Sequence, residues 1–332
     1  MNKDAVRVGQ IDLPAVFPSV RLLESLRAAW SIPCLIVAFL VYAGFQLNPL
    51  ETFENESPDL TSAVSTFGSA TLAQWVFSIE VILVYGMTRG FAVLGLLVLR
   101  MLFLGFAAVG IARFTALLVN RHERSGVLQI LRFMAGCWKP IVVSTFLTIA
   151  IVLLGVLCFR FAGYLPTWSS RGPNHADALN IVFWLSSLLT LVGLYVVLAG
   201  WLLGLSAIAI DGDDGAEALS RGISFVLSRF RRTSCFLILI GLLASVAGKI
   251  TAGCLAVSGR VALRSISKSP QIPPMVSEGV ASFQTGLTEC VHLSAFCCGL
   301  AIAYLILRQV IDNVDFREIS DQKSPTIIND QQ

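Results

Sequence analysis

The longest stretch without a charged side chain is the feature that most constrains this fold. Residues 178–210 are 33 consecutive residues without Asp, Glu, Lys or Arg. A helix of about 20 apolar residues is enough to cross the roughly 30 Å hydrocarbon core of a bilayer. In the whole chain 55% of the residues are hydrophobic and 14% are charged, and the mean hydropathy is +0.77. Because an ordinary soluble domain is far less apolar, the sequence predicts a membrane protein.

Five further apolar segments accompany this stretch. Four are free of charged residues over 16 to 23 positions, and the fifth is interrupted by Arg100. The apolar residues are continuous rather than alternating, which favours helices over the strands of a membrane barrel. We therefore predict an all-α, polytopic transmembrane helical bundle of about six spans with two cytoplasmic amphipathic surface helices. The predicted spans are residues 28–50, 90–118, 140–162, 180–210, 233–257 and 287–311.

The other segments flank or separate these spans. We predict that residues 1–27 form a cytoplasmic amphipathic N-terminal segment and that residues 28–311 form the membrane domain. Residues 312–332 are predicted to be a disordered cytoplasmic tail. Residues 72–88 are apolar, but they number only 17 and include Glu80. We interpret them as a helix on the outer surface or an extension of the second span, with an additional span as the alternative.

The distribution of positive charge predicts the orientation. Lys and Arg in short loops remain on the cytoplasmic side during insertion. With both termini inside, the inner segments hold 16 Lys and Arg residues and the outer segments hold 5. We therefore expect a multi-pass protein of the cytoplasmic (inner) membrane with both termini cytoplasmic. This asymmetry suits anionic lipid headgroups, and the chain has no basic motif for nucleic acid, so membrane lipids are the expected partners.

A charged segment follows the longest apolar run. Residues 211–232 read DGDDGAEALSRGISFVLSRFRR, with acids first and arginines last, as the helix dipole prefers. Asp214 and Glu217 match the two ends of a capping box, and four apolar residues recur at helical spacing on one face. We predict an amphipathic helix at the inner membrane interface, with its terminal arginines near lipid phosphates. The apolar residues are Leu219, Ile223, Val226 and Phe230.

A similar segment lies between the second and third spans. Ser125 is a candidate cap there, and aligning Gly126 with Gly215 places Arg132 on Arg221. Either a duplicated unit of span, surface helix and span, or the shared physics of the membrane interface, explains the likeness. We predict that Arg132 and Arg221 contact headgroups or the acids of a neighbouring inner segment.

The acids of residues 211–217 also suggest a metal-dependent phosphotransfer site. Asp213, Asp214 and Glu217 are, however, explained as residues that begin a helix, and no second motif completes such a site. The chain has no Gly-x-Ser-x-Gly, no His-Glu-x-x-His and no phosphate loop. We therefore predict that the protein is not an enzyme and has no catalytic, cofactor-binding or metal-binding residue.

Four polar residues lie inside the predicted spans. They are Arg100, Lys249, Glu289 and His292, and such groups at bilayer depth suggest a functional site. One hypothesis is a polar pocket in the outer half of the bundle, where Glu289 neutralises Arg100 or Lys249 and a solute is transported or sensed. The alternative is snorkelling side chains and one structural ion pair. One Glu-x-x-His pair is too few ligands for a carboxylate-bridged metal site.

Three segments are similar to the landmarks of a known family. They are GIARFTALLV at 110–119, DGDDGAEALSRGISFVLSRF at 211–230 and AIAYLILRQVIDNVDFREI at 301–319. In their order and motifs they resemble a family of uncharacterised, planctomycete-type bacterial multi-span integral membrane proteins. The resemblance covers most of the chain and implies a multi-span membrane protein, without implying an activity.

Two classes of function remain open. The first is a structural, binding or lipid-interacting membrane module of unknown molecular activity, and the second is a transporter-like protein with a polar pocket in the outer half of the bundle. Small residues in the fourth span allow close helix contacts within the bundle or in a homo- or hetero-oligomer. These residues are Gly193, Ala199, Gly200 and Gly204.

Overall fold

The structure, a computed structural model, describes residues 22–46, 90–121, 125–168, 173–266 and 274–312. Regular structure in these ranges is entirely helical, which confirms the predicted all-α class. The predictions for residues 1–21, 72–88 and 313–332 fall outside the described residues. The helices are α2 (Glu24–Ala29), α3 (Ile32–Gln46), α6 (Gly90–Arg121), α7 (Val127–Gly136), α8 (Trp138–Trp168), α9 (Pro173–Asp211), α10 (Gly215–Ser228), α11 (Phe230–Ile266) and α12 (Pro274–Ile311).

Five of these helices, within the described residues, are long and apolar enough to cross a membrane. The first predicted span corresponds to α2 and α3, whose apolar part, Ile32–Gly44, is shorter than the other five. Helices α9 and α12 begin at Pro173 and Pro274, where proline is well suited to the first helical position. The five segments are Leu97–Val119, Trp138–Gly155, Trp184–Asp211, Phe230–Gly259 and Gly279–Ile311.

Helix α12 forms the centre of the fold. Over its most apolar 18 residues α12 is 94% buried, compared with 28% for α11 and 33% for α8. Helices α2, α3, α6, α9 and α11 all pack against it. The hydrophobic side chains between Cys290 and Leu307 are buried on nearly every side of α12, as expected for a helix surrounded by protein. The apolar core therefore follows α12 along the bundle.

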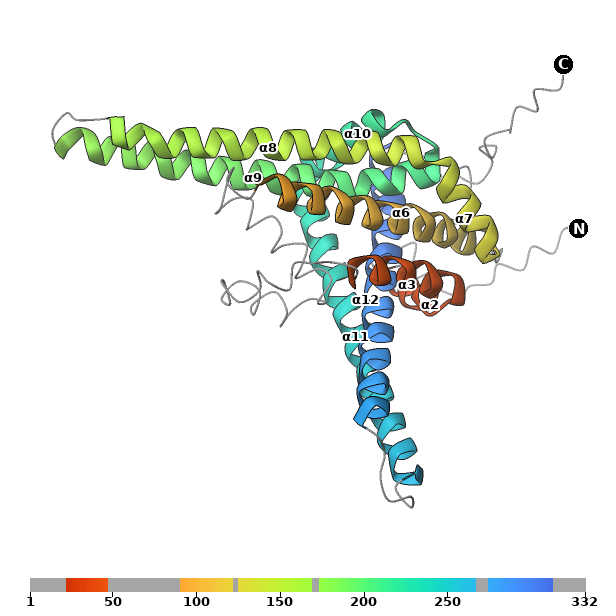
Figure 1. The fold of residues 1–332 in the computed structure, drawn as a ribbon. Coiled ribbons are helices and arrows are strands. Elements are labelled where there is room, and N and C mark those ends of the chain that lie inside the picture. The colour runs from red at the N-terminus through yellow and green to blue at the C-terminus, as the bar shows by residue number, and fades with distance from the viewer. Residues whose placement is uncertain (1–21, 47–89, 122–124, 169–172, 267–273, 313–332) are drawn as a thin grey trace, which may run out of the picture.

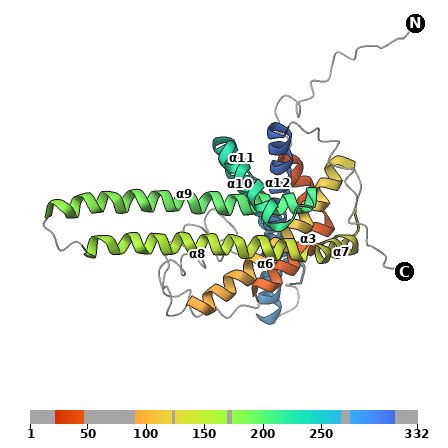
Figure 2. The same ribbon diagram turned by 90° about the horizontal axis from the view of Figure 1, so that it is seen from above.

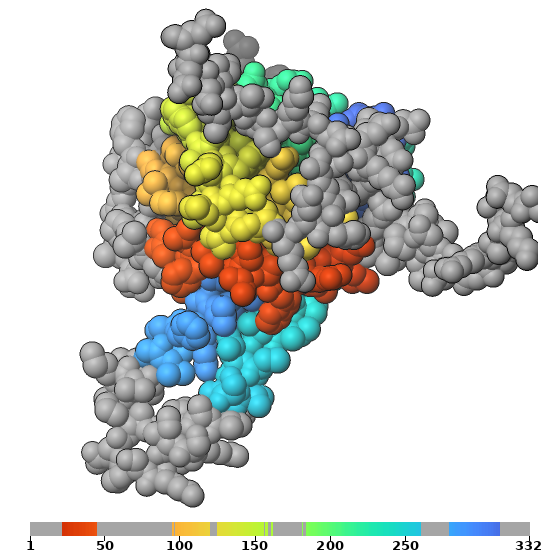
Figure 3. Space-filling model, turned by 90° about the vertical axis from the view of Figure 1, so that its right-hand side faces the viewer, coloured from red at the N-terminus to blue at the C-terminus, as the bar shows by residue number. Residues whose placement is uncertain are grey.

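Two helical hairpins project from this core in different directions. Helices α8 and α9 lie side by side and extend to the left in both Figure 1 and Figure 2. Helices α11 and α12 form the second hairpin, which extends downward in Figure 1. Figure 3 shows α2 and α3 in red as a band below the yellow α7, with the α11–α12 hairpin projecting beyond them.

Helix α10 is wedged against α8 and α9 through glycine contacts. A Cβ atom on Gly222 would lie 2.0 Å from the carbonyl oxygen of Gly200, and one on Gly215 would lie 2.2 Å from that of Pro140. Leu219 and Val226 are at most 1% exposed. Leu219, Ile223 and Val226 of the apolar face that we expected in the membrane interface therefore pack against protein, because glycines let the helix backbones approach closely. Phe230, the last residue of that face, is 42% exposed.

The starts of the two short amphipathic helices differ from the expected caps. Asp214 occupies the predicted N-cap position of α10, but its side chain makes no capping hydrogen bond. In α7 the N-cap residue is Gly126 rather than Ser125, again without a side-chain bond. Gly212 has a φ of 75°, a left-handed conformation that glycine adopts readily, and it turns the chain from α9 into α10.

We expect Gly222→Ala to destabilise the protein by about 1–3 kcal/mol, because the added methyl group forces α10 away from the backbone of α9. Gly193→Ala in α9 is the matched control, since nothing lies within 4 Å of the Cβ position there. Thermal unfolding in detergent should show a lower Tm for Gly222→Ala and an unchanged or slightly higher Tm for Gly193→Ala. Equal Tm values for the two variants would contradict the close packing of α10.

Candidate functional site

Asp211, the last residue of α9, lies where α9, α10 and α12 meet. Its carboxylate accepts hydrogen bonds from the Tyr304 hydroxyl and from Nη1 of Arg308, both on α12. It also accepts a hydrogen bond of 2.9 Å from Nη1 of Arg221 on α10. The Asp211 side chain is only 4% exposed, so one buried carboxylate joins three helices.

Arg221 extends this network to two further acids. Its Nη1 lies 3.0 Å from Oδ2 of Asp213, and its Nη2 lies 3.5 Å from Oε1 of Glu217. The Asp213 side chain is 10% exposed, whereas that of Glu217 is 61% exposed. We call Asp211, Asp213, Arg221, Tyr304 and Arg308 the polar latch. Glu217 lies at its solvent-exposed edge.

The local sequence explains why these groups meet. A carboxylate at the C-terminus of a helix faces the negative end of the helix dipole, so Asp211 is stable there only beside cations. Tyr304 and Arg308 are four residues apart, which places both on one face of α12. The turn at Gly212 brings α10, and with it Arg221, back toward the end of α9. Two arginines thereby neutralise a buried acid.

Other side chains surround the latch at the same ends of the helices. The centres of the Phe225 ring on α10 and the Tyr304 ring on α12 lie 5.6 Å apart. Nη1 of Arg113 on α6 donates to the carbonyl of Ala209, 3.4 Å away, and its guanidinium lies 5.0 Å from the centre of the Phe133 ring on α7. Helices α6, α7, α9, α10 and α12 therefore share one polar layer.

Burial in the latch shifts the pKa of Asp213. Burial raises this pKa from 3.8 to about 6; Arg221 opposes the shift, while the nearby Asp211 and Glu217 add to it. Burial lowers the pKa of Arg221, but Tyr304 and the two aspartates outweigh this effect and raise it above its ordinary value. Asp213 is therefore the acid of this layer whose protonation changes near pH 6.

Stability is expected to depend on pH through Asp213. Because its pKa is higher in the folded protein than in the unfolded chain, the folded state binds the proton more tightly, and this group lowers stability as pH rises from about 4 to about 6. Asp213→Asn removes this contribution. The Tm of the variant minus that of the wild type should therefore grow between pH 4.5 and 7. Parallel Tm curves for the two proteins would exclude this assignment.

Removing the central carboxylate should have a larger effect. Asp211→Asn removes the acid that pairs with Arg308 and one of the three acids beside Arg221, and breaking a buried ion pair in this way costs about 3–5 kcal/mol. Asp214→Asn is the control, because Asp214 is exposed and makes no capping bond. Thermal unfolding should show a large drop in Tm for Asp211→Asn only. A drop of similar size in both variants would indicate a general effect of charge.

The structure places the predicted site residues in different surroundings. Arg221 lies in the latch, and Arg132 is exposed on α7. Arg100 on α6 and both Glu289 and His292 on α12 are 4%, 9% and 6% exposed. The imidazole Nδ1 of His292 lies 3.2 Å from the Cβ position of Gly248 on α11. Lys249 is exposed on α11, so it does not share the buried setting of the other three.

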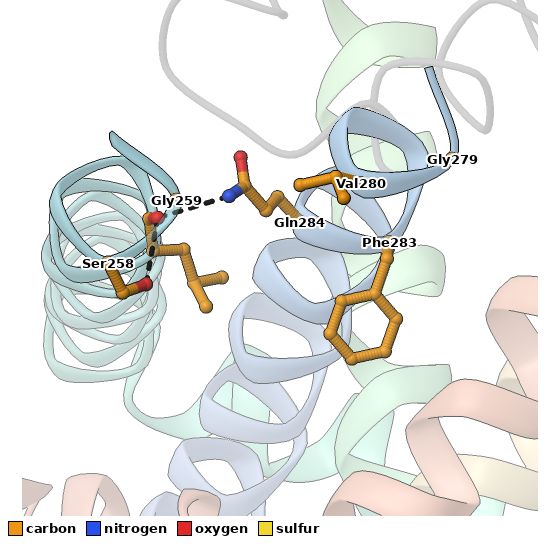
Figure 4. Close-up of a pocket in the computed structure, with 7 residues that line it drawn as sticks. Ser258, Gly259, Gly279, Val280, Phe283 and Gln284 are labelled. Carbon is orange, nitrogen blue, oxygen red and sulfur yellow. Dashed lines mark hydrogen bonds between the residues drawn. The ribbon is translucent and has the colours of Figure 1, made fainter. Parts of the chain in front are cut away.

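A pocket is found at a different place in the fold. It has a volume of about 460 Å³ and lies between the far ends of α11 and α12 (Figure 4). Nε2 of Gln284 donates to the carbonyl of Leu255, 3.1 Å away, across this pocket. None of the four intramembrane candidates lines it. The lining residues are Leu255, Ser258, Gly259, Gly279, Val280, Phe283 and Gln284.

The sequence did not reveal two members of the latch as site residues. Tyr304 and Arg308 were visible only within the segment 301–319 that carries the family resemblance, whereas Asp211 was among the acids weighed for a phosphotransfer site. The segment 110–119 of the same resemblance contains Arg113. These segments meet at the polar layer. Within the described residues, no group of three or more His, Cys, Asp or Glu is arranged to hold a metal ion. No family model matches the chain, and neither a curated protein nor a solved structure matches it.

Proposed function

We propose that the protein is a non-enzymatic, lipid-interacting structural module of the cytoplasmic (inner) membrane. The observation that carries this proposal is the exposure of large apolar side chains on helices long enough to span a bilayer. Leu154 on α8 is 61% exposed, and Trp184 and Leu189 on α9 are 72% and 74% exposed. Contiguous apolar surface of this kind is unfavourable in water, whereas lipid acyl chains cover it.

The polar latch supports the structural part of the proposal. It joins the C-terminal end of α9 directly to that of α12 and also to α10, and it leaves the apolar sides of both hairpins exposed. The hairpins project in different directions (Figure 1), so they meet the membrane normal at different angles. A module of this shape presents two separate apolar surfaces to lipid or to partner helices while the latch fixes their common end.

The buried polar residues favour this module over a transporter-like protein. A transport pocket built from Arg100, Lys249, Glu289 and His292 requires all four groups to face one cavity. Lys249 is exposed, and none of the four lines the pocket between α11 and α12. The resemblance to the planctomycete-type family is consistent with the module and adds no activity to it.

Native cysteines provide a test of membrane insertion and orientation. Cys158 is exposed near the far end of the α8–α9 hairpin, Cys235 and Cys254 are exposed on α11, and Cys34, Cys290, Cys297 and Cys298 are buried. The test therefore uses a chain in which Cys235 and Cys254 are replaced by Ser. With the latch on the cytoplasmic side, a membrane-impermeant maleimide added to intact cells should label Cys158 from outside, and the further change Cys158→Ser should remove most of the signal. The protein should also remain in the membrane pellet after alkaline carbonate extraction.

Two results would contradict the proposal. Release of the protein into the carbonate supernatant would show that it is not embedded in lipid. Labelling of Cys158 only after the cells are permeabilised, with the protein still in the pellet, would leave the module embedded but reverse or remove the α8–α9 crossing.

A further inference from the structure

The arginines of residues 211–232 fall into two groups. Arg221 is taken up by the polar latch, where it pairs with Asp211, Asp213 and Glu217. Three others, at the junction of α10 and α11, are exposed and form no ion pair with any acid in the part of the chain that the structure describes. Three acids of the segment thus pair with Arg221, the fourth, Asp214, is exposed at the start of α10, and three arginines remain outside the latch. These arginines are Arg229, Arg231 and Arg232.

This basic cluster lies at one end of a membrane span. Arg229 is the C-cap residue of α10, and Phe230 begins both α11 and its span-length apolar segment. Leu227 and Phe230 beside the arginines are 62% and 42% exposed. Exposed apolar side chains interleaved with arginines at the end of a span match the boundary between acyl chains and headgroups.

The junction is held in a defined position. The Phe230 ring lies edge-on to Tyr195 of α9, with ring centres 5.6 Å apart. The Tyr195 hydroxyl donates to Oγ of Ser234 at 2.8 Å, and the backbone N–H of Arg229 donates to the carbonyl of Phe225 at 3.3 Å. The cluster therefore lies where α10 ends and on the first turn of α11, where α11 packs against α9. A preorganised cluster loses less entropy when it binds a ligand.

We infer that Arg229, Arg231 and Arg232 form a binding site for the phosphate of an anionic phospholipid headgroup, with Leu227 and Phe230 against its acyl chains. Guanidinium groups bind phosphate oxygens through paired, charge-assisted hydrogen bonds. The apolar neighbours and the position at the end of a span select a lipid over a nucleic acid or free phosphate. This inference rests on the proposed membrane module and names the lipid class that the module recognises.

The test uses the full chain purified in a neutral detergent and titrated with phosphatidylglycerol or with phosphatidylcholine. Each basic residue near an anionic surface contributes roughly fivefold to the affinity. The triple variant Arg229→Gln, Arg231→Gln, Arg232→Gln should therefore bind phosphatidylglycerol about a hundredfold more weakly than the wild type, with its binding of phosphatidylcholine unchanged. In 1 M salt the preference of the wild type for phosphatidylglycerol should largely disappear, because the screening length falls to about 3 Å.

Two control variants separate charge from folding. The triple lysine variant at the same positions keeps the charge and should retain most of the affinity. Arg27→Gln removes a different exposed arginine, on α2, and should bind like the wild type. The inference is overturned if the glutamine variant keeps its preference for phosphatidylglycerol, or if inorganic phosphate or an oligonucleotide at equal charge binds the cluster as well as the lipid does. Either result leaves the membrane module intact, since carbonate extraction tests that proposal separately.

Discussion

The buried carboxylate of Asp211 is the interaction on which the rest of the structure depends. A carboxylate at the end of a long apolar helix is unfavourable both because it leaves water and because it faces the negative end of the helix dipole. Arg221 and Arg308 remove this penalty, and Tyr304 donates a further hydrogen bond. The acid therefore requires α10 and α12 to lie against the end of α9.

Close helix packing makes this arrangement accessible. Gly200 and Gly222 let the backbones of α9 and α10 touch, so that Arg221 reaches Asp211 from a helix that begins only four residues after it. The same packing runs α10 back along α9, so that Phe230, just beyond the end of α10, contacts Tyr195. Arg229 and the two arginines that follow Phe230 then lie outside the latch, where lipid phosphates are the natural counterions in a membrane.

Much of the fold could be predicted from the sequence, because its signals are local. The length of an uncharged run marks a span, and Asp214 marked the start of α10 correctly. The partners of Asp211 could not be predicted in this way, because Tyr304 and Arg308 lie 93 and 97 residues away and no local pattern pairs them. In the sequence, an arginine on the polar face of a helix has the same spacing whether its partner is a lipid headgroup or a buried acid.

The sequence pattern also could not show whether the apolar stripe of α10 contacts lipid or protein. Leu219 and Val226 recur at helical spacing, and this spacing is the same for a helix that lies on lipid and for one that packs on protein. Glycines on both helices distinguish the two cases, but only once Gly200 is known to face Gly222. Ser125 illustrates the same point for caps, since the backbone placed Gly126 at the N-cap position instead.

A double-mutant cycle between Asp211 and Arg308 tests the central claim most directly. The unfolding free energies of Asp211→Asn, Arg308→Gln and the double variant are compared with that of the wild type under one detergent condition. Residues in direct contact show coupling energies of about 0.5–3 kcal/mol, whereas independent sites add within about 0.5 kcal/mol. The latch predicts a coupling of at least about 1 kcal/mol, and additive effects would show that Asp211 does not hold α9 to α12.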